Sequence, residues 1–362
     1  MNFNQILKEA VQQNASDLHA LIGQPPAFRI NGNIVRSGHP IVTSQDVREF
    51  LEKTLTSTQW ESLQKKLALC FSHFVADVGR FRATVYYHRN KAELSFRMIW
   101  PKIPGRESLG LPLVVEDLAR RHHGLVIVTG PTGVGKTTTL NYMIDLINRE
   151  RSSKIVMIED PIEYEHQSAK SLVVQQEIPS DAPSFHAALI HALRQDPDVI
   201  CIGEMRDLET IATALTAAET GHLVLTTLHT PNALQTIDRI VGAFPGDQRT
   251  FISHQFAGAL EGIVSQMLLP RANNQGRVVA CEVILGNDAV KNLIRDGKTH
   301  QIPSIVQTGA KQGMQLMDQT LKELFNNGTI SHETYARATR KQTDSAPVLT
   351  GASLGASRVE TS

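Results

Sequence analysis

The segment from Leu125 to Thr137 constrains the fold of this chain more than any other. A strand-like run, residues 125–129, leads directly into Gly-Pro-Thr-Gly-Val-Gly-Lys-Thr at 130–137, and a helical pattern follows. In such a loop the glycines let consecutive backbone N–H groups curve around phosphate oxygens. The helix then presents its positive N-terminus to the anion. A glycine-rich turn that only joins a strand to a helix is the less favoured interpretation in this context.

The loop therefore predicts that the chain binds a nucleoside triphosphate, with ATP and Mg²⁺ as the expected ligands. Lys136 is expected to reach the β- and γ-phosphates, and the Thr137 hydroxyl is expected to hold Mg²⁺. The predicted nucleotide-binding residues are Gly130, Pro131, Thr132, Gly133, Val134, Gly135, Lys136, Thr137 and Thr138.

Composition narrows the class of protein. The 362 residues leave room for two domains with sizeable cores. With 36 basic and 36 acidic residues the formal charge is zero, so no general attraction to nucleic acid is expected. The three cysteines lie far apart without a CxxC pair, which indicates neither a zinc ribbon nor a disulfide framework. No long apolar run and no signal-peptide core occur, so we expect a cytoplasmic protein that meets a membrane through partners.

The first hundred residues predict a small α+β domain. Apolar residues at Phe3, Ile6, Leu7 and Ala10 mark one face of an initial helix, and a second helical stretch runs from 44 to about 67. Strand patterns occupy residues 17–22, 27–30, 33–35, 80–87 and 93–100. Prolines and glycines then cluster in residues 101–114, which we interpret as a linker.

Beyond the linker, strands alternate with helices, which predicts a parallel sheet. The expected strands are 125–129, 154–159, 172–176, 199–202, 223–227 and 277–284, and the helices between them include 137–149, 184–195, 208–220 and 233–244. A phosphate-binding loop within such a sheet indicates an α/β fold with a RecA-like P-loop NTPase core, residues 115–340. Residues 341–362 are poor in large apolar side chains and are expected to be a disordered tail.

Acidic residues follow two of the predicted strands, at the sheet edge where open α/β sheets bind ligands. Glu159-Asp160-Pro161-Ile162-Glu163-Tyr164 places three carboxylates after one strand, although a solvated acidic loop is an open alternative. Glu204 comes directly after the apolar run 199–202 and Gly203. This position is typical of a Walker-B carboxylate, which binds Mg²⁺ directly or through water. A charged strand cap is the alternative there.

Two histidines, His222 and His229, bracket the predicted strand 223–227. At a spacing of seven they point to opposite faces of an extended strand, which argues against a shared metal ion. Hydrogen-bonded histidines at strand ends are one interpretation. The other is that one of them senses the γ-phosphate.

These segments, in this order after the P-loop, resemble the secretion ATPases of type II secretion and type IV pili, and within them the PilT-type pilus retraction motors. The resemblance extends to about residue 340. Its motifs are residues 16–19, 130–137, 159–164, 193–198, 203–207, 222–229, 236–241, 289–296 and 307–315.

The resemblance implies a smaller PAS-like N-terminal domain, a RecA-like C-terminal domain and a homo-hexameric ring. It implies Glu163 as the general base and Glu204 as the carboxylate associated with Mg²⁺. Arg82 and Arg97 lie in the strands that match those whose arginines approach the phosphates in the family, from across a subunit interface. The alternative is that both arginines are only surface residues. His222 and His229 complete the expected catalytic set.

The chain also departs from the family pattern. The usual Gln-Arg-Glu appears as Gln175-Gln176-Glu177, and residues 289–296 differ conservatively at three positions. In the retraction motors that this chain resembles, the last of these elements is tied to retraction rather than to hydrolysis. The tetracysteine zinc insert of assembly and secretion ATPases is missing, which favours the retraction branch.

The function predicted from the sequence is a cytoplasmic hexameric ATPase that powers pilus retraction and twitching motility. It is expected to act on an inner-membrane platform protein, with a second motor ATPase as a further candidate partner. Three alternatives stay open: an accessory ATPase of another envelope machine, a DNA translocase on the same core, and a nucleotide-binding ring scaffold. Zero net charge disfavours the translocase, and no nucleic-acid partner is expected.

Overall fold

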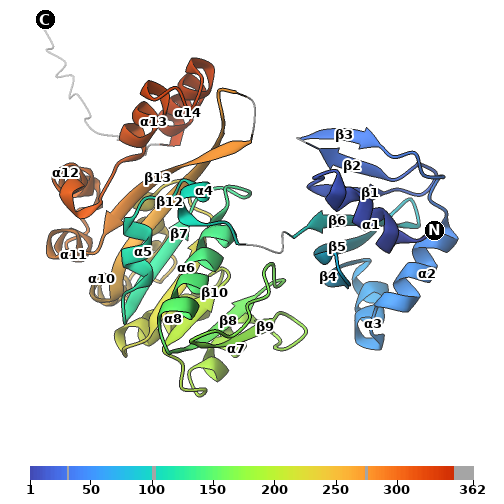
Figure 1. Cartoon of the computed structure of the whole chain (residues 1–362). Coiled ribbons are helices and arrows are strands. Elements are labelled where there is room, and N and C mark those ends of the chain that lie inside the picture. The colour runs from blue at the N-terminus through green and yellow to red at the C-terminus, as the bar shows by residue number, and fades with distance from the viewer. Residues whose placement is uncertain (31, 100–102, 274–275, 346–362) are drawn as a thin grey trace, which may run out of the picture.

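Two separate β-sheets organise the chain (Figure 1). The structure is a computed structural model that describes residues 1–30, 32–99, 103–273 and 276–345. The N-terminal sheet has the strand order β3-β2-β1-β6-β5-β4, and the C-terminal sheet has the order β13-β12-β7-β11-β10-β8-β9. The mixed α/β architecture expected from the sequence is therefore confirmed.

The N-terminal part is an antiparallel sheet covered by helices. Helix α1 buries Phe3, Ile6, Leu7 and Ala10, the predicted apolar face, and the Asn2 side chain caps it by accepting from Gln5 N–H. The elements are α1 (Phe3–Gln12), β1 (Asp17–Ala20), β2 (Ala27–Ile30), β3 (Asn33–Arg36), α2 (Ser44–Thr54), α3 (Ser57–Lys66), β4 (Ala68–Val75), β5 (Gly79–His88) and β6 (Lys91–Met98).

The single helix expected over residues 44–67 is wrong, because the structure has two. Helix α2 ends at Thr54, and Thr56 begins a new helix with a capping box. Its side chain accepts from Gln59 N–H, and the Gln59 side chain accepts from Thr56 N–H. Leu67 then adopts a left-handed conformation that ends α3 directly before β4, a strand that the sequence analysis did not predict.

The C-terminal sheet is parallel from β12 to β9, as predicted, and only β13 runs antiparallel to its neighbour β12. Its strands are β7 (Gly124–Thr129), β8 (Lys154–Glu159), β9 (Leu172–Glu177), β10 (Val199–Ile202), β11 (Leu223–Leu228), β12 (Leu260–Pro270) and β13 (Arg277–Leu285). Strand β12 was not predicted, because it follows the preceding helix without any loop or breaker residue.

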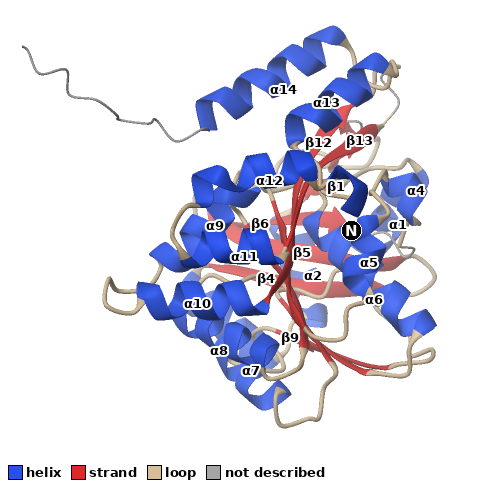
Figure 2. Cartoon of the chain, turned by 90° about the vertical axis from the view of Figure 1, so that its left-hand side faces the viewer, coloured by secondary structure: helices blue, strands red, loops and turns tan. Residues whose placement is uncertain are grey.

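The helices of this part lie on both faces of the sheet, and the view in Figure 2 separates α8, α9 and α10 from α5 and α6. They are α4 (Arg106–Leu109), α5 (Val114–Ala119), α6 (Lys136–Glu150), α7 (Phe185–Ala192), α8 (Leu208–Glu219), α9 (Ala233–Gly242), α10 (Arg249–Ala259), α11 (Asp288–Arg295), α12 (Ile302–Thr308), α13 (Met317–Asn326) and α14 (His332–Ser345), with 3₁₀ turns at Thr299–Gln301 and Ala310–Gln312.

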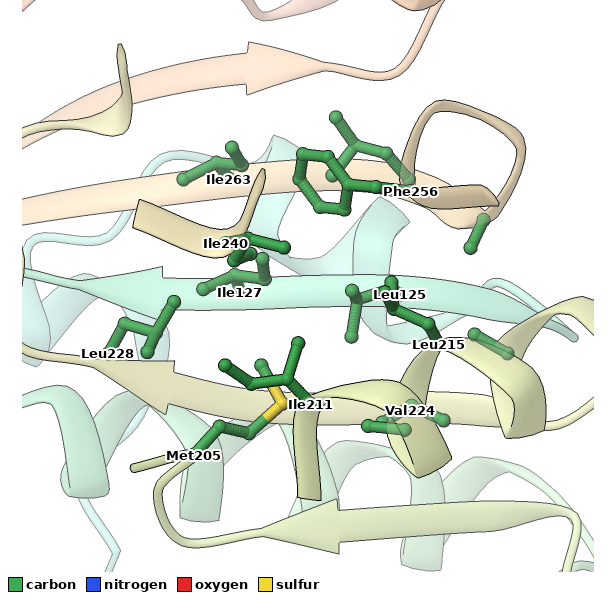
Figure 3. Close-up of a cluster of buried hydrophobic side chains, with 14 of the residues drawn as sticks. Leu125, Ile127, Met205, Ile211, Leu215, Val224, Leu228, Ile240, Phe256 and Ile263 are labelled. Carbon is green, nitrogen blue, oxygen red and sulfur yellow. The ribbon is translucent and has the colours of Figure 1, made fainter. Parts of the chain in front are cut away.

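Strand β7 is buried on both faces, as a central parallel strand requires. Leu125 and Ile127 pack with Ile211, Leu215 and Phe256 on one face (Figure 3). The alternate residues Val126 and Val128 pack against α5 and α6 on the other face. Two cores therefore hold the phosphate-binding loop rigidly at the end of β7.

The structure can be compared with the predicted linker, residues 101–114, and with the predicted tail, residues 341–362. The expected linker contains the short helix α4 and reaches α5, while residues 100–102 lie outside the described part. Helix α14 runs to Ser345 and so includes residues 341–345 of the expected tail, whose remaining residues also lie outside it. Within the described residues, no helix combines the length and apolar character needed to cross a bilayer.

Candidate nucleotide-binding site

The predicted phosphate-binding loop connects β7 to α6, as the sequence pattern requires. Gly130 has φ +136°, and a Cβ atom there would lie 2.4 Å from the carbonyl oxygen of Gln266 on β12. Only glycine fits this position. Helix α6 begins at Lys136, so its free N–H groups face the loop. Val134 is buried beneath the loop, while Pro131, Thr132 and Gly133 are exposed at its rim.

Lys136 is held inside the loop by neutral groups. Its Nζ donates to Gly130 O at 2.8 Å and to Pro131 O at 3.0 Å, and it lies 3.2 Å from His229 Nδ1. The side chain is buried, and this burial lowers the pKa of Lys136, whereas the charge of Glu204 raises it. Phosphate oxygens would be stronger acceptors for the ammonium group than these carbonyls.

His229 connects the lysine to the Walker-B carboxylate. Because the ammonium group of Lys136 can only donate, His229 Nδ1 acts as an acceptor and Nε2 carries the proton. Nε2 then donates to Glu204 Oε2 at 3.2 Å. Arg206 Nη2 contacts the other oxygen, Oε1, at 2.6 Å. The structure thus brings Lys136, His229 and Glu204 together. Each of them follows a different strand of the C-terminal sheet.

Glu163 meets the phosphate-binding loop from the loop after β8. Burial raises its pKa, whereas the charges of Arg82 and Arg97 and a hydrogen bond from Thr137 lower it. The net direction is upward, so Glu163 is a stronger base than a solvated carboxylate. The neighbouring Tyr164 forms a side-chain hydrogen bond with Thr138.

Arg82 and Arg97 lie directly opposite each other on β5 and β6. Arg82 Nε donates to Cys70 Sγ at 3.3 Å, and Arg97 Nε donates to Asp17 Oδ1 at 3.0 Å. Both arginines act electrostatically on Glu163 of the same chain. Their expected approach from a neighbouring subunit is therefore not needed to bring them near the site.

His222 is placed apart from the other candidates. It precedes β11, whereas His229 follows it, so the whole length of the strand separates them. His222 Nδ1 lies 3.0 Å from Ala217 O and 3.3 Å from Thr220 Oγ1. Within one chain His222 is thus a local hydrogen-bonding residue at the opposite edge of the sheet.

The sequence analysis missed the residues that support the site. Gln175 on β9 forms three hydrogen bonds with the Glu163 loop and the end of β8, and Asn148 on α6 holds the same loop further on. Arg80 Nη2 lies 3.6 Å from Glu165 Oε2, a contact that the sequence analysis did not anticipate. The sole sequence signal for Gln175 was the Gln-Gln-Glu triplet at 175–177.

The donor set fits a magnesium ion that also binds phosphate. Thr137 and Glu204 supply a hydroxyl and a carboxylate oxygen, the hard ligands that Mg²⁺ prefers. In the described part of the chain, no group of three His, Cys, Asp or Glu residues could hold a metal by itself.

Comparisons with known proteins agree with this geometry. A family model described as "Type II/IV secretion system protein" matches residues 112–360. The "Type IV pilus retractation ATPase PilT" of Pseudomonas aeruginosa is 42% identical over 92% of this chain and 96% of its own. The "Twitching motility protein" of Neisseria gonorrhoeae is 41% identical over 92% and 89%, respectively. The crystal structure of the pilus retraction motor PilT with bound ADP superposes with a TM-score of 0.86 at 43% identity, covering 96% of this chain and 98% of that one.

Proposed function

Because the chain belongs to the type II/IV secretion system protein family, we propose that it is an ATP-hydrolysing motor that powers retraction of a type IV pilus. One observation carries the hydrolytic part of this proposal. Glu163, made more basic by burial, lies against Thr137 of the phosphate-binding loop and faces two arginines. The retraction part is supported by relatives that are named for this activity and align over almost the whole chain.

In the proposed reaction the γ-phosphate lies between the loop 130–138 and the arginines of the N-terminal part. Lys136 exchanges the carbonyls of Gly130 and Pro131 for phosphate oxygens. Glu163 accepts a proton from the attacking water, the bond from the γ-phosphorus to the bridging oxygen breaks, and ADP and phosphate leave. Arg82 and Arg97 offset the negative charge of the transferring group.

Thr137 and Glu204 are the residues proposed to hold Mg²⁺, the latter directly or through water. When bound, this ion neutralises phosphate charge and orients the triphosphate. His229 keeps Glu204 in place through its Nε2–H, and Nδ1 stays free to accept from Lys136.

Retraction requires that hydrolysis move a partner. We propose a cytoplasmic homo-hexamer that acts on an inner-membrane platform protein, with a second motor ATPase as a further partner and no nucleic acid. The Glu163 loop interacts with both parts of the chain, because Glu163 bonds with Thr137 of one part and Glu165 pairs with Arg80 of the other. Loss of the γ-phosphate would therefore change how the two parts are held together.

The test compares purified wild type with Glu163→Gln for ATP hydrolysis, ATP binding and size on a column. The amide cannot accept the proton, so turnover should fall roughly 10²- to 10⁴-fold while ATP still binds. Glu209→Gln, on the exposed surface of α8, serves as the control and should keep full activity. Unchanged turnover in Glu163→Gln would remove Glu163 from the role of base. A wild-type monomer without turnover would favour a scaffold or partner-dependent subunit instead.

A further inference from the structure

The side-chain amide of Gln175 forms three hydrogen bonds with the end of β8 and with the loop that follows this strand. Its Nε2 donates to Glu159 Oε1 at 2.9 Å and to Tyr164 O at 2.7 Å. Its Oε1 accepts from His166 N–H at 2.8 Å. A backbone carbonyl only accepts and a backbone N–H only donates, so the orientation of this amide is fixed by its partners.

These bonds hold the backbone on the C-terminal side of Glu163. On the other side, the carboxylate of Glu177 accepts from Ile162 N–H at 3.1 Å. Gln175 and Glu177 are two residues apart on β9 and therefore project from the same face of the strand. The loop segment 162–166, with Glu163 inside it, is thus attached to an edge strand by two side chains.

A second set of contacts shows that this attachment determines the position of Glu163 relative to α6. The same segment lies along α6, where Glu163 bonds with Thr137, Tyr164 bonds with Thr138, and His166 Nε2 lies 2.7 Å from Asn141 Oδ1. The segment therefore lies between β9 and the first turns of the phosphate-binding helix. A change in its attachment to β9 would move Glu163 relative to Thr137.

We propose that Gln175 is a positioning residue for hydrolysis, which fixes the Glu163 loop against the phosphate-binding helix by bonding Glu159, Tyr164 and His166 at once. This inference rests on the proposed function, since it assigns Glu163 its catalytic role. Gln175 itself touches no substrate. Its effect is on the geometry of the base, where a displacement of about 1 Å can cost roughly 10²-fold in rate.

The decisive variant is Gln175→Glu, which has the same shape but carries no N–H donor when ionised. It sets a second carboxylate against Glu159 and the Tyr164 carbonyl, so the loop loses two hydrogen bonds and gains a repulsion. A proton shared by the two carboxyl groups would restore one donor. The other titratable groups beside this cluster are Glu163 in the loop, Glu177 on β9 and Cys201 on β10. The imidazole of His166 contacts Asn141 instead, and only the backbone N–H of His166 bonds with Gln175.

The experiment measures kcat and KM for ATP of wild type and Gln175→Glu from pH 5.5 to 8.5. At each pH the kcat of Gln175→Glu is divided by the kcat of the wild type. The ratio removes the titrations that both proteins share. We expect it to fall about 10- to 100-fold between low and high pH with KM nearly unchanged. Gln167→Glu, an exposed position in the same loop, adds the same charge without the hydrogen bonds and should give a flat ratio near one.

A second variant tests the role of Gln175 in the structure of the loop without relying on ATP turnover. Gln175→Leu keeps the volume without polar atoms, and hydrogen exchange of residues 160–167 should be at least 10-fold faster in it, with the α6 amides as protected as in wild type. A pH-independent ratio, or unchanged exchange in the loop, overturns the positioning role. Absence of turnover in the wild type overturns the proposed function, and the exchange result still decides the role of Gln175.

Discussion

Glu159 is a buried carboxyl group whose charge state affects the fold. Only 4% of it is exposed, and burial raises its pKa to about 7, although the hydrogen bond from Gln175 lowers it and the charge of Glu163 raises it. The titratable groups acting on it are Glu163 in the adjacent loop, Glu177 on β9 and Cys201 on β10. The folded chain therefore binds this proton more tightly than the unfolded chain does.

The first prediction concerns stability against pH. Because the folded-state pKa of Glu159 lies above its ordinary 4.5, its stabilising effect is complete below pH 4.5 and is lost as pH rises through 7. The full loss amounts to about 3 kcal/mol in the free energy of unfolding. Glu159→Gln stays neutral and keeps an acceptor for Gln175, so it should become progressively more stable than wild type between pH 5 and 8. Thermal unfolding of both proteins across this range checks the prediction, and a constant difference in Tm would contradict it.

At the scale of elements, helix α6 organises the site along one of its sides. Its first turns bond with the Glu163 segment, and its last turn is linked to residues 167–171 through Asn148. Asn148 is 3% exposed; its Nδ2 donates to Gln167 O at 2.8 Å and its Oδ1 accepts from Ala169 N–H at 2.9 Å. The helix that receives phosphate thus also carries the loop of the proposed base.

The second prediction is that Asn148→Leu destabilises the protein by about 1–2 kcal/mol, because the buried amide of Asn148 is lost and the backbone groups of Gln167 and Ala169 lose their hydrogen-bond partner. The measurement is the Tm by calorimetry, with ATP turnover recorded at 25 °C. Asn326→Leu, at an exposed position near the end of α13, is the matched control and should leave Tm within about a degree of wild type. An equal Tm for both variants would mean that the backbone groups of Gln167 and Ala169 find other partners.

The elements that sequence predicted best are those whose signal is contiguous. The P-loop, Glu163, Glu204 and the strands before them follow from local patterns, since a residue directly after a parallel strand must lie at its carboxyl edge. The same rule separates His229, after β11, from His222, before it. Gln175, in contrast, acquires its role only through the pairing of β9 with β8.

Two boundaries between elements, the one between α2 and α3 and the one between α10 and β12, were not predicted from the sequence. The break between α2 and α3 depends on a capping box at Thr56 that competes with a helical pattern continuing on both sides. Strand β12 begins at the residue after α10 ends, with no turn residue to mark the change. At Thr56 a local cap outweighs the helical pattern, whereas at Leu260 the pairing of β12 with β7 and β13 decides where the helix stops.

At the scale of the whole molecule, the N-terminal part contributes charge to a site built on the C-terminal sheet. Strand β5 lies on the side of the N-terminal part that faces β8 and β9 (Figure 1). It carries Arg82, whose charge acts on Glu163, and Arg80, whose Nη2 lies 3.6 Å from Glu165 Oε2. Arg80 Nη1 also donates to Ser72 Oγ on β4 at 2.8 Å, which fixes the guanidinium group from its own side.

The last prediction follows from this cross-domain ion pair. Arg80→Glu places two carboxylates face to face and adds repulsion from Glu177, which feels the charge of Arg80 in the wild type. The N-terminal part should then lie less often in the arrangement that brings Arg82 to Glu163. Because a partly exposed ion pair is a weak interaction, we expect kcat/KM for ATP to fall only about 2- to 10-fold.

The double variant Arg80→Glu with Glu165→Arg restores opposite charges in reversed order and should recover at least half of the loss. Steady-state ATPase assays of the wild type, both single variants and the double variant form the cycle, at low and at moderate salt. Salt should shrink all the differences, because it screens exposed charges. If the double variant is no better than the worse single variant, Arg80 acts through its bond to Ser72 within the N-terminal sheet, and the two parts are held together by other contacts.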